Sequence, residues 1–440
     1  MNAARQLGFW TCVALVVGNI VGSGIFLLPS SLAPYGLNSV WGWLLTSTGA
    51  MVLAMVFAGL SRALPEAGGP QEYTRIAFGD VTSFVVVWGY WISNWVGNAA
   101  LATAAVSYTS ELFPWIATTP GAAPFMTLLF VWLVTAVNLY HVRAASAFQA
   151  VTTALKLLPL LAVAGLGGYL LFTGDARLHN AHLAATPFRL HDVTAAATLT
   201  LWALMGLESA AVVARTVRDP ERTIPRASLL GTALAAAAFI LACTTIMALI
   251  PGATLAKSNA PFADVAGMFW GSAAGHWVAL FAAISCVGAL NGWTFLNAQL
   301  SSQMASTGLF PRVLARVSAR GTPTVSLLAT SALTSVLVLL NYGQSMVAVF
   351  NFMILLSTTA CLVMYLLCAL ALLRLLQNGA LQAARGRAAG LAVAGVLGTV
   401  YALWALAGAG TEALLWGAVL LLAGVPLYAW MRSAQRAAAI

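Results

Sequence analysis

The residues best able to do chemistry in this chain lie in the middle of its first hydrophobic segment. The run from about Phe9 to Pro29 is long enough to cross a bilayer, which takes ~20 residues, yet its centre reads Gly18-Asn19-Ile20-Val21-Gly22-Ser23-Gly24. Unwound backbone persists in hydrocarbon only inside the protein or beside a water-filled cavity. Amide N–H groups freed at the start of a half-helix can bind a carboxylate. The segment therefore predicts a mid-membrane substrate site of the kind found in transporters.

A second segment interrupted in this way follows about 180 residues later. It runs from Thr198 to Ser209, with Gly206 at mid-span and Glu208 shortly after it. Taken alone, Gly206 is better explained by close packing of two helices. Paired with the first interruption, it indicates an inverted-repeat transporter whose first and sixth spans are both broken.

The composition predicts an all-α membrane protein with a single transmembrane domain over residues 1–440. Of the 440 residues, 61% are hydrophobic and 7% are charged, whereas a soluble domain carries about 25% charged residues. Hydropathy predicts about twelve transmembrane helices, near 9–32, 38–62, 81–111, 122–142, 147–172, 192–215, 227–250, 272–304, 324–341, 346–373, 389–408 and 412–431. A five-plus-five inverted repeat would comprise residues about 9–172 and about 192–373, followed by two trailing helices at about 389–431.

The charged residues predict how these spans are oriented. With both termini in the cytoplasm, most of the 20 Lys and Arg residues fall on the cytoplasmic side, as the positive-inside rule requires. The net charge of +9 is therefore a topology signal, and binding to nucleic acid is not expected. The five cysteines lie in predicted spans without CxxC spacing and the five histidines are scattered, so no metal site, disulfide or cofactor is expected. The sequence has no nucleophile–base arrangement that would indicate an enzyme, and it has no filter repeat that would indicate a channel.

Two ionisable residues are predicted to lie at depth in the membrane, where a functional role is the default explanation. Glu208 is the only one of the 11 acidic residues that is away from a loop or a span end. Burial would let it titrate near neutral pH as a gate or a proton-sensitive switch, and the alternative is a structural carboxylate hydrogen-bonded to another helix. Lys156 is either a fixed cation that holds the unwound carbonyl groups of the first span or a proton carrier.

The aromatic and uncharged polar residues divide by their depth. Five tryptophans near span ends are expected to form an interfacial belt: Trp41, Trp43, Trp115, Trp416 and Trp430. Trp202 and Trp293 lie deep in their spans, where an indole is either part of the core or a surface over a substrate cation. Four polar residues at depth are either contacts between helices or pocket lining: Asn94, Asn98, Asn291 and Ser357.

The first break and two loop motifs together resemble the amino acid–polyamine–organocation (APC) superfamily. The loop from Pro65 to Tyr73, PEAGGPQEY, is similar to the superfamily's first cytoplasmic signature, and Arg218 to Pro225, RDPERTIP, is similar to the signature after span six. The likeness runs over nearly the whole chain and is greatest to bacterial arginine/agmatine antiporters. It implies a LeuT-like fold in a bacterial inner membrane and a small-molecule amino acid or amine as substrate. It also implies contact with membrane lipids, and it leaves a homodimer open.

The resemblance implies a role for each matching residue. Ser23 and Gly24 match the turn that binds the substrate carboxylate. Ile20, Trp202 and Met205 match the positions whose backbone carbonyl groups bind the α-amino group of the substrate. Asn19 belongs to the same substrate site. Side chains around the guanidinium of arginine match Asn98, Trp293 and Ser357. Trp202 and Glu208 match gating residues on the outer side of the antiporters. Tyr90, Phe350 and Tyr365 match the aromatic residues of their gates.

Two positions depart from that pattern. Asn94 stands where the antiporters have cysteine, which makes the distal pocket more polar. Lys156 instead resembles neutral amino-acid exchangers and proton-coupled relatives, in which a lysine replaces a sodium site. The expected function is secondary transport, with arginine/agmatine antiport first and neutral amino-acid exchange or proton-coupled symport as the alternative. Exchange of arginine for its decarboxylation product would export the equivalent of a proton in each cycle, as acid resistance requires.

Overall fold

The structure is a computed structural model that describes most of the chain. The described residues are 8–64, 67, 69–140, 142–175, 183, 186–206, 217, 219–318, 321–341, 343–381 and 385–437. Within these ranges the elements are helices, which agrees with the predicted all-α fold.

The helices follow the apolar runs of the sequence closely. In chain order they are α1 (Phe9–Ile20), η1 (Ser23–Phe26), α2 (Leu28–Leu32), η2 (Ala33–Tyr35), α3 (Asn38–Ala63), α4 (Pro70–Phe78), α5 (Asp80–Leu112), α6 (Trp115–Thr118), α7 (Ala122–Tyr140), α8 (Val142–Thr173), α10 (Leu190–Ala203), α12 (Pro220–Leu249), α13 (Gly252–Leu255), α14 (Pro261–Trp270), α15 (Ser272–Ser306), η5 (Arg312–Ala315), α16 (Thr324–Leu340), α17 (Met346–Gln377), α18 (Arg385–Gly408), α19 (Thr411–Leu422) and α20 (Gly424–Ala437). The last predicted span is divided between α19 and α20, which meet at Ala423.

Membrane-spanning length and composition are found in 8 segments of the described chain. They are Asn38–Ala63, Ala122–Tyr140, Leu155–Thr173, Arg222–Leu249, Ser272–Ser306, Met346–Gln377, Arg387–Gly408 and Thr411–Ser433. Two shorter apolar helices, Phe9–Gly18 and Thr324–Leu340, accompany them. The chain is therefore a multi-pass membrane protein. The 33-residue α5 is absent from this set, because the many polar residues of this largely buried helix lower its mean hydropathy.

The interruption predicted in the first span is present. Helix α1 ends at Ile20, and Gly22 has an extended backbone with ψ of 178° before η1 begins at Ser23. The amide of Gly22 donates to the carbonyl oxygen of Ile20 at 2.6 Å in a local turn. Helix α10 ends at Ala203, and the chain then turns through Gly206, whose φ of +101° favours glycine. The remainder of the second predicted break, including Glu208, lies outside the described residues.

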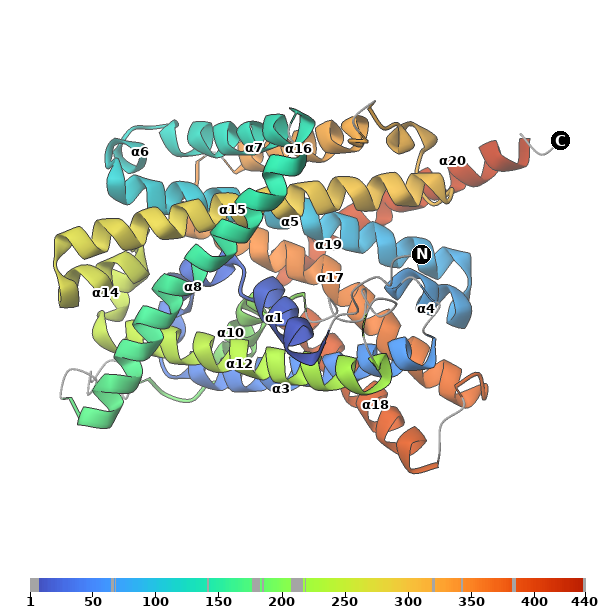
Figure 1. Ribbon diagram of the computed structural model, residues 1–440, viewed down its shortest axis with the longest axis horizontal. Coiled ribbons are helices and arrows are strands. Elements are labelled where there is room, and N and C mark those ends of the chain that lie inside the picture. Colours follow the sequence, from blue (N-terminus) through green and yellow to red (C-terminus); the bar gives the residue numbers. More distant parts are fainter. Residues whose placement is uncertain are drawn as a thin grey trace.

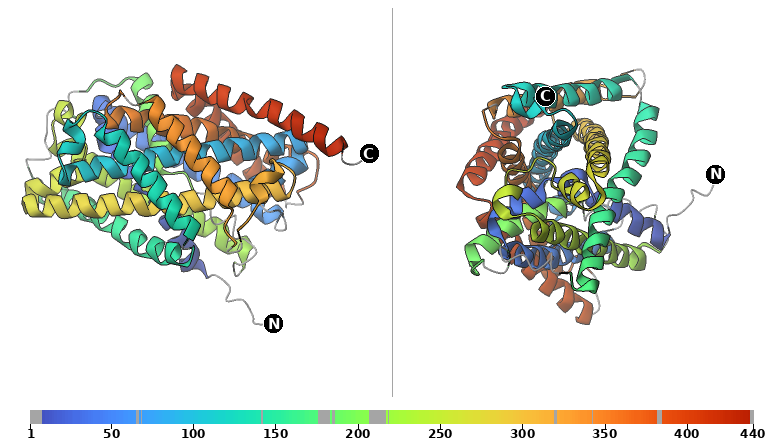
Figure 2. Two further views of the ribbon diagram at one scale, coloured as in Figure 1. Left: turned by 90° about the horizontal axis from the view of Figure 1, so that it is seen from above. Right: turned by 90° about the vertical axis from the view of Figure 1, so that its left-hand side faces the viewer.

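Helices α3, α5, α12 and α15 run roughly along the horizontal direction of Figure 1, whereas α8 and α18 run obliquely to them. Helices α14 and α6 lie at one end of the bundle and α4 at the other. Helix α5 packs against α15 and α17, while α10 packs on α3 and α1 packs on α12. The end-on view in Figure 2 shows the helices arranged around the centre of the bundle. This arrangement brings α1, α5, α10, α15 and α17 to one place, where the first span is broken.

The burial of side chains confirms one set of predictions and corrects another. The five cysteines are buried, as expected for packing residues. Trp41, Trp115 and Trp430 are exposed, but Trp43 is only 1% exposed and its ring packs on Phe239 at a centroid distance of 5.8 Å. The expectation that Trp43 belongs to the interfacial belt is therefore wrong. Its position near a span end was informative about depth but not about which face of α3 meets α12.

Candidate functional site

A cavity of about 60 Å³ lies beside the break in the first span. That volume is several times the ~10–15 Å³ that one water molecule needs. Helices α5, α10, α15 and α17 contribute to its wall together with the broken segment. The lining residues are Ile20, Gly22, Gly24, Ile25, Tyr90, Ser93, Asn94, Gly97, Asn98, Leu101, Trp202, Ala203, Met205, Gly206, Trp293, Ser357 and Cys361.

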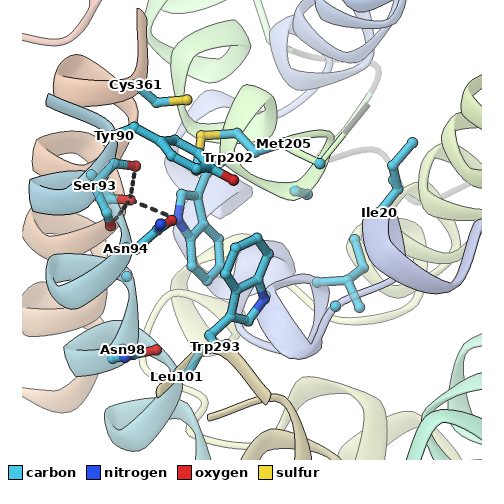
Figure 3. Close-up of a pocket in the computed structure, with 17 residues that line it drawn as sticks. Ile20, Tyr90, Ser93, Asn94, Asn98, Leu101, Trp202, Met205, Trp293 and Cys361 are labelled. Carbon is cyan, nitrogen blue, oxygen red and sulfur yellow. Dashed lines mark hydrogen bonds between the residues drawn. The ribbon is translucent and has the colours of Figure 1, made fainter. Parts of the chain in front are cut away.

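One wall of the cavity is held together by hydrogen bonds between three helices. The hydroxyl of Ser357 donates to the carbonyl oxygen of Ser93 at 2.8 Å, and the two hydroxyl oxygens lie 3.1 Å apart. The indole Nε1 of Trp202 donates to the Ser357 hydroxyl at 3.3 Å. Figure 3 shows these bonds beside Asn94, with Ile20 on the opposite side of the cavity. Ser357 therefore fixes the orientation of Trp202 as well as lining the cavity.

Trp202 is also packed from two further directions. Its ring meets Phe350 edge to face, with a centroid distance of 5.6 Å and an interplanar angle of 90°. On another side it lies against the backbone at Gly24, where an added Cβ would be 2.0 Å from Cζ3 of the indole. The lack of a side chain at Gly24 thus creates the space that the indole occupies.

A buried amide oxygen is available at another part of the wall. Asn98 is 3% exposed, and its Nδ2 donates to Thr294 Oγ1 at 3.4 Å. Its Oδ1 has no hydrogen-bond partner among the described residues. Leaving a buried acceptor unpaired is costly, so a donor that reached this oxygen would stabilise it. Trp293, which precedes Thr294 on α15, lines the same cavity.

A buried lysine supports the first half of the broken span. Lys156 on α8 is 5% exposed, and its Nζ donates to the carbonyl oxygen of Gly18 at 2.6 Å. The last four carbonyl groups of a helix lack intrahelical donors, and Gly18 is two residues before the end of α1. The ammonium therefore pairs a carbonyl group that the break leaves free, which is the geometry of the fixed-cation interpretation.

Most of the side chains expected in the site meet at this cavity. The predicted residues that line it are Ile20, Gly24, Tyr90, Asn94, Asn98, Trp202, Met205, Trp293 and Ser357. Phe350 lies behind Trp202, and Tyr365 does not line the cavity but packs on Phe57 at a centroid distance of 5.6 Å. The side chains of Asn19 and Ser23, like the whole of Glu208, lie outside the described part of the chain. Asn291 accepts a hydrogen bond from Asn138 Nδ2 at 2.8 Å, which is a contact between helices.

Several lining residues were not anticipated from the sequence. Gly97 and Leu101 lie three and seven positions after Asn94 on α5, and Cys361 lies four positions after Ser357 on α17. Residues three, four and seven apart share a helix face, so the helical period could have identified them. Ser93 carries the same signal, because it lies three positions after Tyr90 on α5.

The chemistry of the described lining is that of binding. No group of three or more His, Cys, Asp or Glu residues that could hold a metal ion occurs in the described chain. The described lining residues include no carboxylate and no cationic side chain. Aromatic faces, amide and hydroxyl groups and freed backbone can hold a polar small molecule without reacting with it.

Comparison with known proteins identifies the family. A family model described as amino acid permease matches residues 7–425. The chain is 35% identical over 349 residues to the cadaverine/lysine antiporter of Escherichia coli (strain K12), covering 78% of this chain and 77% of that protein. It is 30% identical over 432 residues to the putrescine transporter PotE of Haemophilus influenzae, with 97% of each chain covered.

A third relative is the putative arginine/ornithine antiporter of Bacillus subtilis, which is 31% identical over 412 residues with 86% of each chain covered. These relatives are named as transporters and antiporters, and none of their names describes an enzyme. The chain therefore belongs to the amino acid permease family of the APC superfamily and is a membrane transporter, not an enzyme.

Proposed function

We propose that this protein exchanges a cationic amino acid for the amine formed by its decarboxylation. The observation that carries this proposal is that Trp293 and Asn98, whose Oδ1 has no partner among the described residues, line one cavity whose described lining has no carboxylate. An aromatic face and a neutral oxygen stabilise a cation without a charge of their own. Such a site can bind and release cations that differ in whether they also carry a carboxylate.

The opposite end of the substrate is assigned to the broken first span. The first N–H groups of a helical segment lack intrahelical acceptors, so the amides of Ser23 and Gly24 are the donors for a substrate carboxylate. Backbone carbonyl groups near Ile20 and Trp202 would receive the α-amino group. An amine that lacks the carboxylate would lose the amide contacts but keep the distal ones.

The distal cation is assigned to Trp293, with Asn94 and Asn98 beside it. A cation over a desolvated indole is stabilised by up to ~2 kcal/mol. Asn98 Oδ1 adds a hydrogen-bond acceptor that has no protein partner among the described residues. This combination suits both a guanidinium group and a primary ammonium group.

The relatives support a basic substrate pair. Their names include lysine with cadaverine, putrescine, and arginine with ornithine. Arginine with agmatine, the pair expected from the sequence, has the same chemistry as lysine with cadaverine and ornithine with putrescine. In each case the decarboxylation consumes a proton, so exchange exports the equivalent of that proton. Alternating access by two inverted repeats, with both termini in the cytoplasm, is part of this proposal.

Counterflow in proteoliposomes tests the proposal directly. Vesicles loaded with agmatine, cadaverine or putrescine would be assayed for uptake of labelled arginine, lysine or ornithine, with empty vesicles as the control. We expect uptake only against a loaded amine or basic amino acid. Equal uptake of alanine or leucine, with no competition from the basic substrates, would contradict the proposal.

A second candidate function is favoured by Lys156. Its Nζ lies 2.6 Å from the carbonyl oxygen of Gly18, so a positive charge lies against the first half of the broken span, outside the cavity lining. A proton-coupled carrier of neutral amino acids could use such a charge in place of a sodium ion. For that carrier, Lys156→Ala would abolish uphill accumulation of alanine, whereas a pure exchanger would retain exchange.

A further inference from the structure

A second and larger cavity lies at the end of the bundle opposite α14, among α4, the start of α5, the end of α15 and α20. Its volume is about 360 Å³, which is within the range of ~300–1,000 Å³ usual for small-molecule sites. Figure 1 shows α4 and the end of α20 at this end of the molecule. The lining residues are Gln71, Glu72, Arg75, Asp80, Gln303, Met304, Thr307, Gly308, Leu309, Tyr428, Met431 and Arg432.

The cavity is lined by two acidic and two basic side chains, which form two ion pairs. Arg75 is paired with Glu72 at 2.7 Å, and Arg432 is paired with Asp80 on a different helix. The hydrogen bond and charge of Glu72 raise the pKa of Arg75, and the charge of Asp80 acts on it in the same direction. Asp80 therefore acts on both guanidinium groups. The four charges sum to zero, so a ligand with a single charge meets attraction and repulsion together.

The pairing leaves these groups open to a ligand. The four side chains are between 32% and 51% exposed. Arg432 is also held in place by Tyr428, whose hydroxyl accepts from Nε at 2.9 Å and whose ring lies 5.3 Å from the guanidinium carbon. A guanidinium fixed in this way loses little side-chain freedom when it binds an oxyanion.

We propose that this cavity binds a small zwitterion that joins an ammonium group to a phosphate or carboxylate. The oxyanion would contact Arg75 and Arg432, and the ammonium N–H groups would donate to Glu72 and Asp80. This ligand is distinct from the transported substrate, because the site lies at the end of the bundle and its lining shares no residue with the central cavity. The proposal does not depend on the substrate pair.

Two sources supply this chemistry, a phosphatidylethanolamine headgroup and a free amino acid. The surroundings favour the lipid, because Val81 and Trp430, each next to a lining residue in the sequence, are 60% and 61% exposed. Apolar side chains at the ends of spans are suited to contact acyl chains. The basic residues Arg75 and Arg432 lie at this end of the bundle. The positive-inside rule predicts that this end faces the cytoplasm.

Native mass spectrometry of the full chain in detergent tests the proposal. Phosphatidylethanolamine, phosphatidylcholine and phosphatidylglycerol with identical acyl chains would be added separately, and the retained adducts measured. Alanine would be added in competition with phosphatidylethanolamine. We expect phosphatidylethanolamine to bind best, because phosphatidylcholine has no ammonium N–H group and phosphatidylglycerol has no ammonium at all. Displacement by millimolar alanine would identify a free amino acid as the source, and no displacement would identify the lipid.

Variants locate the binding within this cavity. Asp80→Asn and Arg75→Gln each remove one charge and should weaken phosphatidylethanolamine binding about tenfold, as expected for loss of a charge-assisted hydrogen bond. Arg387→Gln is the matched control, because Arg387 is exposed on α18 and does not line the cavity. Equal retention of the three lipids, or unchanged binding in both cavity variants while each elutes as a folded protein, would overturn the proposal.

Discussion

Gly24 and Trp202 lie in contact across the two interrupted spans, and a Cβ at Gly24 would approach Cζ3 of the indole to 2.0 Å. The contact joins the start of η1 to the end of α10. Trp202 is held there by Ser357 and Phe350 as well. The position of the indole therefore depends on the backbone of the first break, so a change at Gly24 should act on the substrate site through Trp202.

Gly24→Ala should weaken substrate binding by displacing the indole. Overpacking of this kind costs about 1–3 kcal/mol, which corresponds to roughly a 5- to 150-fold change if it falls on binding. Gly22→Ala is the matched control, because its Cβ would make only ordinary contacts, with the carbonyl oxygen of Ile20 at 3.8 Å and the amide nitrogen of Gly24 at 3.9 Å. Both variants keep the backbone amides, and binding would be measured on the purified proteins. Equal affinity in the two variants would mean that the indole does not contribute to the site.

Trp293→Leu should reduce the affinity for a cationic substrate while keeping an apolar side chain. Loss of the π face costs roughly 1–2 kcal/mol in a dry site, which corresponds to about a five- to thirtyfold weaker affinity for arginine or agmatine. Trp277→Leu on the same helix is the control, because Trp277 is 59% exposed. A neutral substrate should be affected much less. If arginine, agmatine and alanine lose affinity equally, Trp293 contributes bulk and not a cation contact.

Lys156→Met should destabilise the protein, because it leaves the Gly18 carbonyl group without its buried donor. An unpaired buried acceptor costs about 1–3 kcal/mol. The loss of stability should appear as a lower midpoint of thermal unfolding in detergent. Lys257→Met is the control, because Lys257 is exposed in the loop before α14. An unchanged midpoint in Lys156→Met would contradict the structural role of this ion–carbonyl contact.

Glu208→Gln should flatten the pH dependence of exchange or slow turnover. The sequence predicts that this carboxylate lies deep in the membrane, where an ionised group is costly and a functional role is the default explanation. Rates would be measured in proteoliposomes over a range of external pH, with Glu412→Gln on the exposed start of α19 as the control. A pH profile and rate identical to those of the parent would assign Glu208 a structural role.

Asp264→Asn should raise stability at neutral pH. Burial raises the pKa of Asp264 on α14 above its ordinary value, although the Ser258 hydroxyl, which donates to Oδ2 at 2.5 Å, opposes the shift. A carboxyl whose pKa is higher in the folded state stabilises the fold most when protonated, and this contribution is lost as pH rises through the folded pKa. The variant should therefore have the higher thermal midpoint at pH 7, and the difference should shrink toward pH 4. A difference that grew on acidification would contradict this sign.

The sequence alone determined the broad architecture. Hydrocarbon requires each spanning segment to pair its own backbone groups, so long apolar runs had to be helices, and a glycine-rich interruption at mid-span had to face the protein interior. The break after Ile20 and the helix end at Ala203 lie where the glycines predicted them. Residues such as Asn94 and Asn98, too polar for lipid, were identified correctly as buried for the same reason.

Only the tertiary structure decided which faces of those helices meet. Trp43 is near a span end yet buried, because that side of α3 packs on α12. Ser357 holds Trp202, Lys156 pairs with the Gly18 carbonyl group, and Tyr365 packs on Phe57 outside the cavity lining. Each of these contacts joins residues far apart in the chain. Hydropathy fixes the depth of a residue along a helix, but its partner depends on the rotation and neighbours of that helix, which are set by packing.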